Sequence, residues 1–206
     1  MKQFRKLLSS LLIVCMLVTI SSVNVFAQNT NDATDNVYSE PIFYSSLEEF
    51  TEANTAELEA QEIQVIGGQA YEVEQTDPIT RARYTVWIDW KIGYSASSKI
   101  GLGSYLKAYS TNTNCLLKRV NGTFYWDDLS TYAQGAADIG VTLIVPTYQI
   151  YSAYETKKTF PSGTKVKCDV YGDVDAISEI SGGTFDYTDT VTIPSELKIQ
   201  TLRSHM

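Results

Sequence analysis

The feature that most constrains this chain is a strict alternation of apolar and polar residues that begins at Tyr84. In the first run the apolar residues occupy every second position: Tyr84, Val86, Ile88, Trp90, Ile92 and Tyr94. A period of two sends neighbouring side chains to opposite faces of a β-strand, so one face of this strand is apolar. Further runs follow over about 99–110, 139–154, 164–177 and 184–193, and they predict seven or eight strands and an all-β fold.

The sharpest turn signal is Asn121-Gly122, which stands between two β-prone stretches. A type I′ hairpin turn needs positive φ at both central residues, and Asn and Gly adopt it at least cost. The dipeptide therefore predicts a hairpin in which Val120 pairs with Thr123. One face of that hairpin would carry an apolar set with Arg119 near its turn end: Cys115, Leu117, Phe124 and Trp126.

Two cysteines outside the leader, Cys115 and Cys168, fall on inward positions of separate predicted strands. In an oxidising exterior an even pair most simply forms one disulfide, and two buried thiols are the alternative. Two packed antiparallel sheets joined by this disulfide fit the strand spacing best, with a small barrel as the second choice. The cysteine–tryptophan core resembles the immunoglobulin-type sandwich in outline, although the resemblance covers architecture alone.

Other segments have weaker signals. Residues 139–154 predict one long strand, with a bulge or an edge position at Pro146, where the inward parity changes. Residues 129–138 are interpreted as a loop or a helical turn. The segment Leu197-Lys198-Ile199 is a candidate for a last short strand.

The N-terminus predicts export. Lys2, Arg5 and Lys6 precede the apolar run 7–20, and Ala27 ends a small-residue cleavage site. This pattern is typical of a bacterial signal peptide, so we expect the mature chain to be secreted and extracellular. A retained anchor is the alternative, but the run is shorter than the roughly 18 to 20 residues that a spanning helix needs. No later stretch is long enough and free enough of charge to span a membrane.

Charge divides the mature chain. Residues 28–80 hold twelve acids and no base, whereas 81–206 hold twelve acids and thirteen bases. Within the acidic part, residues 28–44 have the composition of a disordered segment. Ser46 and Glu49 form a capping box, which predicts a short helix from Leu47 to about Gln61. Residues 63–73 predict a hairpin around Gly67-Gly68. We therefore expect a signal peptide (1–27), an acidic linker or propeptide-like segment (28–80) and a β-sandwich domain (81–206). Arg81 and Arg83 mark either a linker end or a protease site.

Several chemistries are disfavoured. The chain has no basic stripe for nucleic acid, and its acidic segment would repel phosphate. The single histidine, His205, is the penultimate residue, which disfavours catalysis by a Ser-His-Asp or Cys-His arrangement and the commonest kind of zinc site. A glycoside hydrolase with paired carboxylates remains an alternative. Its glutamates in the β-domain would be Glu155, Glu179 and Glu196, and no pair is singled out by spacing.

Calcium is the inorganic ligand that the sequence favours, and no other cofactor is expected. Asp173, Asp175 and Glu179 cluster at a predicted strand end, where several oxygen ligands could surround a hard cation. Asp127-Asp128 is a second candidate. Solvated surface carboxylates are the simpler interpretation of both groups.

Aromatic residues are in surplus, with fourteen tyrosines and three tryptophans. Trp87 falls on the polar parity of its strand, so we expect it to be exposed unless the acidic segment covers it. The tyrosines on outward parities are Tyr105, Tyr109, Tyr125 and Tyr171. Exposed aromatic side chains combine an apolar body with a polar group and are common in interfaces; the alternative is that they shield sheet surface as ordinary β-formers.

These observations favour a secreted bacterial binding module that recognises an extracellular protein or polysaccharide, such as a host molecule, through exposed aromatics. The alternatives are a secreted glycoside hydrolase and a toxin-like effector whose acidic propeptide covers its binding face. We expect no catalytic residue if the first hypothesis holds.

Overall fold

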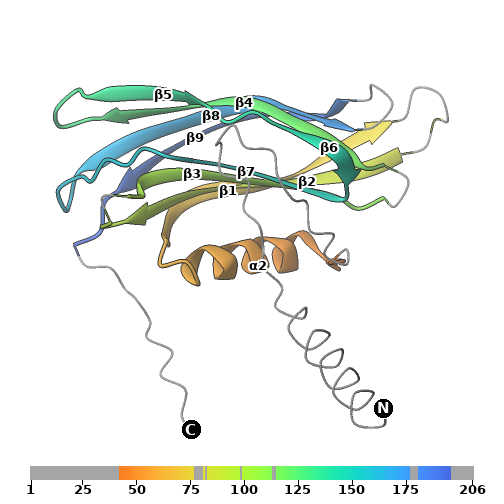
Figure 1. Ribbon diagram of the computed structural model, residues 1–206, viewed down its shortest axis with the longest axis horizontal. Helices are drawn as coiled ribbons and strands as arrows, with labels where there is room; N and C mark the ends of the chain where they lie inside the picture. The colour runs from red at the N-terminus through yellow and green to blue at the C-terminus, as the bar shows by residue number, and fades with distance from the viewer. Residues whose placement is uncertain are drawn as a thin grey trace, which may run out of the picture. The chain divides into compact units, whose positions relative to one another are not determined.

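Two antiparallel sheets form the protein in the computed structural model, which describes residues 42–76, 81, 83–97, 99–112, 115–176 and 181–195. The first sheet has the order β1-β2-β3-β7, with β1 Gln64–Thr76, β2 Arg83–Ser95, β3 Gly101–Ser110 and β7 Gln149–Glu155. The second has the order β5-β4-β8-β9 with β6 also paired to β4, where β4 is Leu117–Asp128, β5 Gln134–Asp138, β6 Val141–Thr147, β8 Lys165–Ala176 and β9 Ser181–Thr192. The sheets lie face to face (Figure 1), so the predicted all-β sandwich is confirmed.

The core lies between the two sheets. The apolar parity of β2 is buried as predicted, from Tyr84 to Tyr94, and faces inward-pointing residues of the other sheet such as Phe124, Val170 and Phe185. Trp90 is fully buried at its centre, and its indole N–H donates to the Ser104 hydroxyl at 3.0 Å. The alternation that predicted the strands therefore also fixed which of their faces packs inside.

One helix of the described residues, α2 (Leu47–Glu59), covers the outer side of the first sheet (Figure 1). It begins where the capping box predicted: the Glu49 N–H donates to the Ser46 hydroxyl at 3.1 Å, and the Ser45 N–H donates to the Glu49 carboxylate at 2.7 Å. After α2 the chain enters β1, which pairs with β2 along its whole length. Residues 42–76, expected to form a separate acidic segment, thus belong to the same compact unit as the strands that follow.

The hairpin prediction at Asn121-Gly122 is wrong, because β4 runs straight through this dipeptide. Gly122 lies opposite Gly172 of β8, and a Cβ added to Gly172 would come within 2.1 Å of the Asn121 carbonyl oxygen. The ring of Phe185 lies over both glycines, 3.0 Å or less from where each Cβ would stand. Gly122 is therefore needed for a close approach of two strands beneath an aromatic ring, rather than for a turn.

Three other local predictions differ from the structure. Gly67-Gly68 forms no turn but continues β1 directly after a bulge between Val65 and Gly67, and Gly68 has φ 128° and approaches the Trp90 carbonyl. The segment 139–154 forms two strands, because the chain leaves one sheet after β6 and enters the other as β7. Residues 134–138, expected in a loop, form the edge strand β5.

The predicted disulfide does not form. Cys115 and Cys168 are both buried; Cys168 lies in β8, and Cys115 lies just before the start of β4. Leu117, at the start of β4, is opposite Ala176, whereas Cys168 is opposite Trp126 near the far end of β4. Eight residues of β8 separate the two positions, which corresponds to roughly 26 Å, far beyond the reach of a disulfide.

Other predictions fall outside the described residues, including the signal peptide and the short strand at 197–199. Arg81 is described and exposed, with φ 60°. None of the described helices has the length and apolar character needed to cross a membrane.

Candidate binding surface

Three of the five predicted surface aromatics are buried beneath α2. Trp87, Tyr105 and Tyr109 have exposed fractions of 7%, 1% and 3%, so the expectation that they form an open surface is wrong. Phe50 of α2 packs on Trp87 and Tyr109, with ring centroids 6.2 and 5.7 Å away. Leu58, about two turns further along the same face of α2, packs on Tyr105 and Ile63. The acidic segment covers Trp87, which is the exception that the sequence allowed for.

Charged groups fill the space between these two apolar contacts. The Asn54 amide donates to the buried Asp89 carboxylate at 2.7 Å, and Lys91 lies 3.2 Å from its other oxygen. Lys107, with 1% of its side chain exposed, donates to both Glu57 oxygens at 2.8 Å. Burial raises the pKa of Asp89, while Asn54 and the two lysines oppose the rise. The outer face of the first sheet is thus occupied by α2.

The outer face of the second sheet is different, because no described helix packs on it. Its polar parity is open to solvent and carries the two remaining aromatics, Tyr125 of β4 and Tyr171 of β8, exposed by 39% and 45%. Their rings are nearly parallel, with centroids 5.7 Å apart and planes 19° apart, and their hydroxyls are 3.1 Å from each other. Strand register explains the contact: Tyr125 is opposite Asp169, the neighbour of Tyr171 on the same face.

Polar groups surround this tyrosine pair. Asp169 is held by two contacts, from the Lys167 ammonium at 3.0 Å and from the Thr188 hydroxyl. A hollow of about 450 Å³ lies beside Tyr125 and is lined by Tyr125, Trp126, Asp127, Gln134, Gly135, Ala136, Lys167 and Asp169. The face thus combines flat rings, fixed hydrogen-bond acceptors and donors, and a shallow depression. Sequence parity identified the two rings, but not Asp169, Lys167 or Gln134, whose polar side chains are ordinary for an outward strand face.

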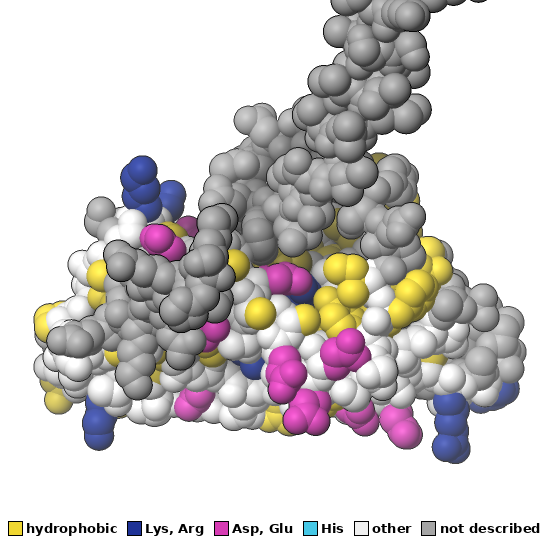
Figure 2. Space-filling model, turned by 90° about the horizontal axis from the view of Figure 1, so that it is seen from below, with side chains coloured by type: hydrophobic (Ala, Val, Ile, Leu, Met, Phe, Trp, Pro, Cys, Tyr) yellow, Lys and Arg dark blue, Asp and Glu magenta, His cyan; other side chains and the backbone are white. Residues whose placement is uncertain are grey.

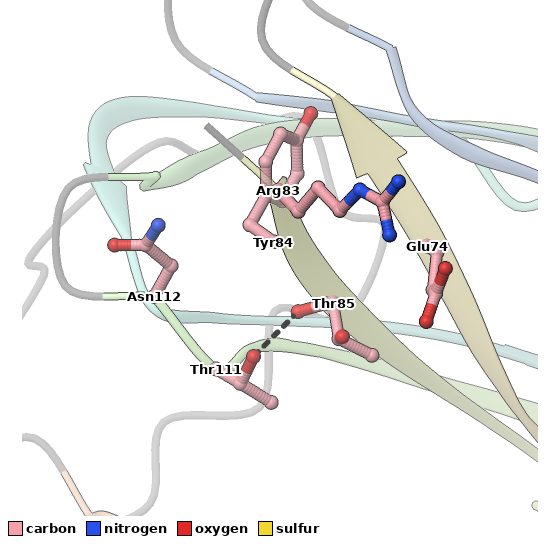
Figure 3. Close-up of a pocket in the computed structure, with 6 residues that line it drawn as sticks. All are labelled: Glu74, Arg83, Tyr84, Thr85, Thr111 and Asn112. Carbon is pink, nitrogen blue, oxygen red and sulfur yellow. Dashed lines mark hydrogen bonds between the residues drawn. The ribbon is translucent and has the colours of Figure 1, made fainter. Parts of the chain in front are cut away.

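A second hollow lies at one end of the first sheet (Figure 3). Its volume is about 360 Å³, and it is lined by Glu74, Arg83, Tyr84, Thr85, Thr111 and Asn112. The Arg83 side chain extends toward Glu74, and the Thr111 hydroxyl donates to the Thr85 carbonyl at 3.0 Å. The hollow is lined by one acid, Glu74, and one base, Arg83, so its charge favours neither an anionic nor a cationic ligand.

The residues predicted for calcium are engaged with a cation of the chain itself. Arg119 contacts Asp175 and lies 4.0 Å from Asp173, so its guanidinium neutralises the carboxylates that would bind calcium. Glu179 lies outside the described residues, among which no cluster of metal ligands is found. Calcium binding at this strand end stays an untested prediction.

Asp128, the second calcium candidate, caps the turn between β4 and β5. Its carboxylate accepts hydrogen bonds from the backbone N–H groups of Ser130 and Thr131 at 2.9 and 3.2 Å, and from both hydroxyls at 2.6 Å. These bonds, of which those from the two hydroxyls have the largest effect, hold the pKa of Asp128 well below its usual range. Four donors from two consecutive residues explain this aspartate as part of a turn.

We expect Asp128→Asn to destabilise the protein at pH 7 and to do so less at low pH. A carboxyl whose pKa is lowered by folding stabilises the fold above its unfolded pKa, near 3.9, and this contribution disappears as the pH falls through the folded pKa. The difference in unfolding free energy between wild type and variant, from urea titrations at pH 7 and pH 3, should therefore shrink at pH 3. An equal difference at both values would contradict this role.

Carboxyls with the raised pKa of a general acid lie elsewhere. Among the described residues these are Asp89 and Glu155, both on the α2 side of the first sheet, where burial raises each pKa. The other candidate glutamates, Glu179 and Glu196, and His205 lie outside the described residues. Asp89 and Glu155 both lie on the other sheet from Tyr125 and Tyr171.

No family model matches the chain, and no similar curated protein or solved structure is found.

Proposed function

We propose that the protein is an extracellular binding module and that the outer face of its second sheet binds a glycan chain. The observation that carries the proposal is the exposed pair Tyr125–Tyr171, with nearly parallel rings on the sheet face that no described helix covers. Adjacent aromatic groups on an open surface are typical of interaction sites, and tyrosine supplies both an apolar ring and a hydroxyl.

A pyranose ring matches these groups. Its C–H face packs on an aromatic ring, and its hydroxyls are both donors and acceptors. Asp169 is fixed beside the tyrosines by Lys167 and Thr188, so it can accept from sugar hydroxyls without first losing its own mobility. Gln134 and Asp127 across the hollow add further groups of the same kind.

The charge of the face favours a neutral glycan. Its outward carboxylates outnumber its cations: Asp127, Asp138, Asp169, Asp173, Asp175 and Asp186 against Arg119, Lys165 and Lys167. A uronic-acid or sulfated chain would be repelled at close range. The other partner class, an extracellular protein, is distinguished by the experiment that follows.

Tyr171→Ala is expected to weaken glycan binding about tenfold, because a lost aromatic contact of about 1 to 1.5 kcal/mol corresponds to that factor. Residues 28–206 are titrated with soluble neutral glucans, mannans and xylans and with anionic pectin, and affinity is measured by gel retardation and calorimetry. Tyr125→Ala should have a similar effect.

The matched control is Tyr132→Ala, because Tyr132 is 85% exposed but lies in the turn beside β5. It should leave affinity unchanged. A glycan that binds wild type and Tyr171→Ala equally would contradict the proposed surface. Retention of secreted host proteins in place of every glycan, with the same dependence on Tyr171, would assign the face to a protein ligand.

A further inference from the structure

The contact between α2 and the sheet is apolar only at its two ends. Phe50 anchors the first turn in the aromatic cluster with Trp87 and Tyr109, and Leu58 anchors the last turn against Tyr105. The middle consists of the Asn54–Asp89 hydrogen bond and the Lys107–Glu57 ion pair. Buried ion pairs give specificity more than net stability, because desolvation offsets most of their attraction. The helix is therefore fitted to this surface in detail but held by few apolar contacts.

Unpartnered polar atoms gather at the same contact. Among the described residues, five buried side-chain atoms lack a hydrogen bond of normal geometry, and four of them belong to α2 or to the face that it covers: Thr51 Oγ1, Asn54 Oδ1, Asp89 Oδ1 and the Tyr105 hydroxyl, which still interacts with the Glu155 carboxylate. Asp89 Oδ1 keeps its ionic contact with Lys91. The fifth, Gln64 Oε1, belongs to the first residue of β1. Unsatisfied buried atoms lower the stability of the state that buries them.

The connection from α2 to β1 is short and strained. Glu62 has φ 62°, the left-handed region, while the N–H groups of Glu62 and Ile63 donate to the carbonyls of Glu59 and Leu58 at 3.0 and 3.1 Å. This is the helix-ending turn in which glycine is the usual residue, because a side chain is sterically disfavoured at positive φ. Opening the turn into an extended chain would release that strain.

We infer that α2 is exchanged between two copies of this chain, so that the helix of each copy docks on the first sheet of the other. The occupant of the sheet face is then the same helix, with the same contacts, supplied by a second molecule. Because the closed monomer and the exchanged dimer contain the same helix–sheet contacts, the equilibrium between them depends on the strain of the connection and on the protein concentration. A short connection under strain favours such an exchange.

The charge pattern favours α2 as the occupant of this face. The helix has acidic residues and no base, including none in its last turn, and acidic side chains are prominent on this side of the molecule (Figure 2). A 13-residue helix with acids near its C-terminus is unstable alone. Lys107 on the sheet supplies a cation to Glu57 of α2, so docking on this face stabilises the helix.

The concentration at which exchange occurs follows from the same terms. A tethered helix competes at an effective concentration on the order of millimolar. Strain at Glu62 lowers the advantage of the closed monomer by a factor of roughly 5 to 30. Each exchanged dimer relieves two such turns, so the factor enters twice and dimers are expected from the order of 0.01 mM, below the concentration of the test.

Complementary charge variants test the exchange. Glu57→Lys and Lys107→Glu each place like charges at the Glu57–Lys107 contact, so each alone disfavours docking of its own helix. In a mixed exchanged dimer every helix meets an opposite charge. Native mass spectrometry and sedimentation velocity at about 0.2 mM should show a one-to-one heterodimer in the mixture and monomer in each variant alone. A mixture that stays monomeric, with both variants folded by circular dichroism, overturns the inference.

Variants of Glu62, in the turn between α2 and β1, test the exchange if a charge variant does not fold. Glu62→Gly removes the strain and should lower the wild-type dimer fraction several-fold. Glu62→Pro cannot adopt positive φ, so it should raise that fraction. Equal dimer fractions in the two variants at 0.2 mM, or no dimer in either, would overturn the exchange.

Discussion

Replacing Trp87 with alanine is expected to lower the free energy of unfolding by about 3 kcal/mol and to leave glycan affinity unchanged. Trp87 is 7% exposed beneath α2, packs on Phe50 and Tyr109, and donates from its indole to Glu72 at 3.0 Å. Truncating a buried tryptophan removes these contacts and leaves a cavity, at a cost of about 3 to 5 kcal/mol. The lower value fits a site that α2 can partly close.

Urea unfolding followed by circular dichroism gives the stability, and calorimetry with the bound glycan at 10 °C gives the affinity. Trp87→Phe, which keeps an aromatic ring in the same cluster, should lose less stability. Normal stability together with lost affinity in Trp87→Ala would instead place this residue on the ligand surface.

Gly172→Ala is expected to destabilise the sandwich by about 3 kcal/mol or more. A Cβ at this position would lie 2.1 Å from the Asn121 carbonyl oxygen and 2.7 Å from the Phe185 ring, and the carbonyl belongs to the paired strand β4. Overpacking of a core costs about 1 to 3 kcal/mol when side chains can adjust, and more where backbone must move. The strands β4 and β8 would have to separate at the centre of the second sheet.

The matched control is Gly163→Ala. Gly163 has φ 80° with no atom within 4 Å of the added Cβ, so alanine there meets conformational strain without a clash. Its cost should be roughly 1 kcal/mol. Urea titrations of both variants separate the two effects, and similar small losses would show that β4 and β8 pair less closely than described.

Alternation made the fold class predictable, because the parity of each strand depends only on its own sequence. It identified the buried sides of β2 and β8. The capping box identified the helix α2. The hairpin prediction at Asn121-Gly122 failed because turn preference is a local property. The glycine is needed instead for the close approach of Gly172, in a strand some fifty residues away. A second glycine at inward parity, Gly172 among Val170 and Val174, was the available signal.

The binding surface was predictable only in part. Parity identified five aromatics on polar faces, but it cannot tell which sheet face another element will cover. The acidic helix covers Trp87, Tyr105 and Tyr109, while Tyr125 and Tyr171 stay exposed. The disulfide prediction failed for a related reason: parity indicated that both cysteines point inward, yet only the pairing of β4 with β8 shows that Cys168 lies near the end of β4 that is far from Cys115.

The two proposals are independent, and each can fail alone. If both hold, exchange of α2 would join two molecules and present two tyrosine pairs to one polymer, and avidity would then strengthen a weak single site. Glycan affinity of the monomer depends only on the second sheet.

The most direct test of the central claim is an amide chemical-shift map of ¹⁵N-labelled residues 28–206 titrated with a neutral oligosaccharide that binds. We predict that the largest shifts fall on β4 and β8 around Tyr125, Asp169 and Tyr171, with α2 unaffected. Shifts confined to α2, β2 and β3, or to the hollow lined by Glu74 and Arg83, would contradict the account.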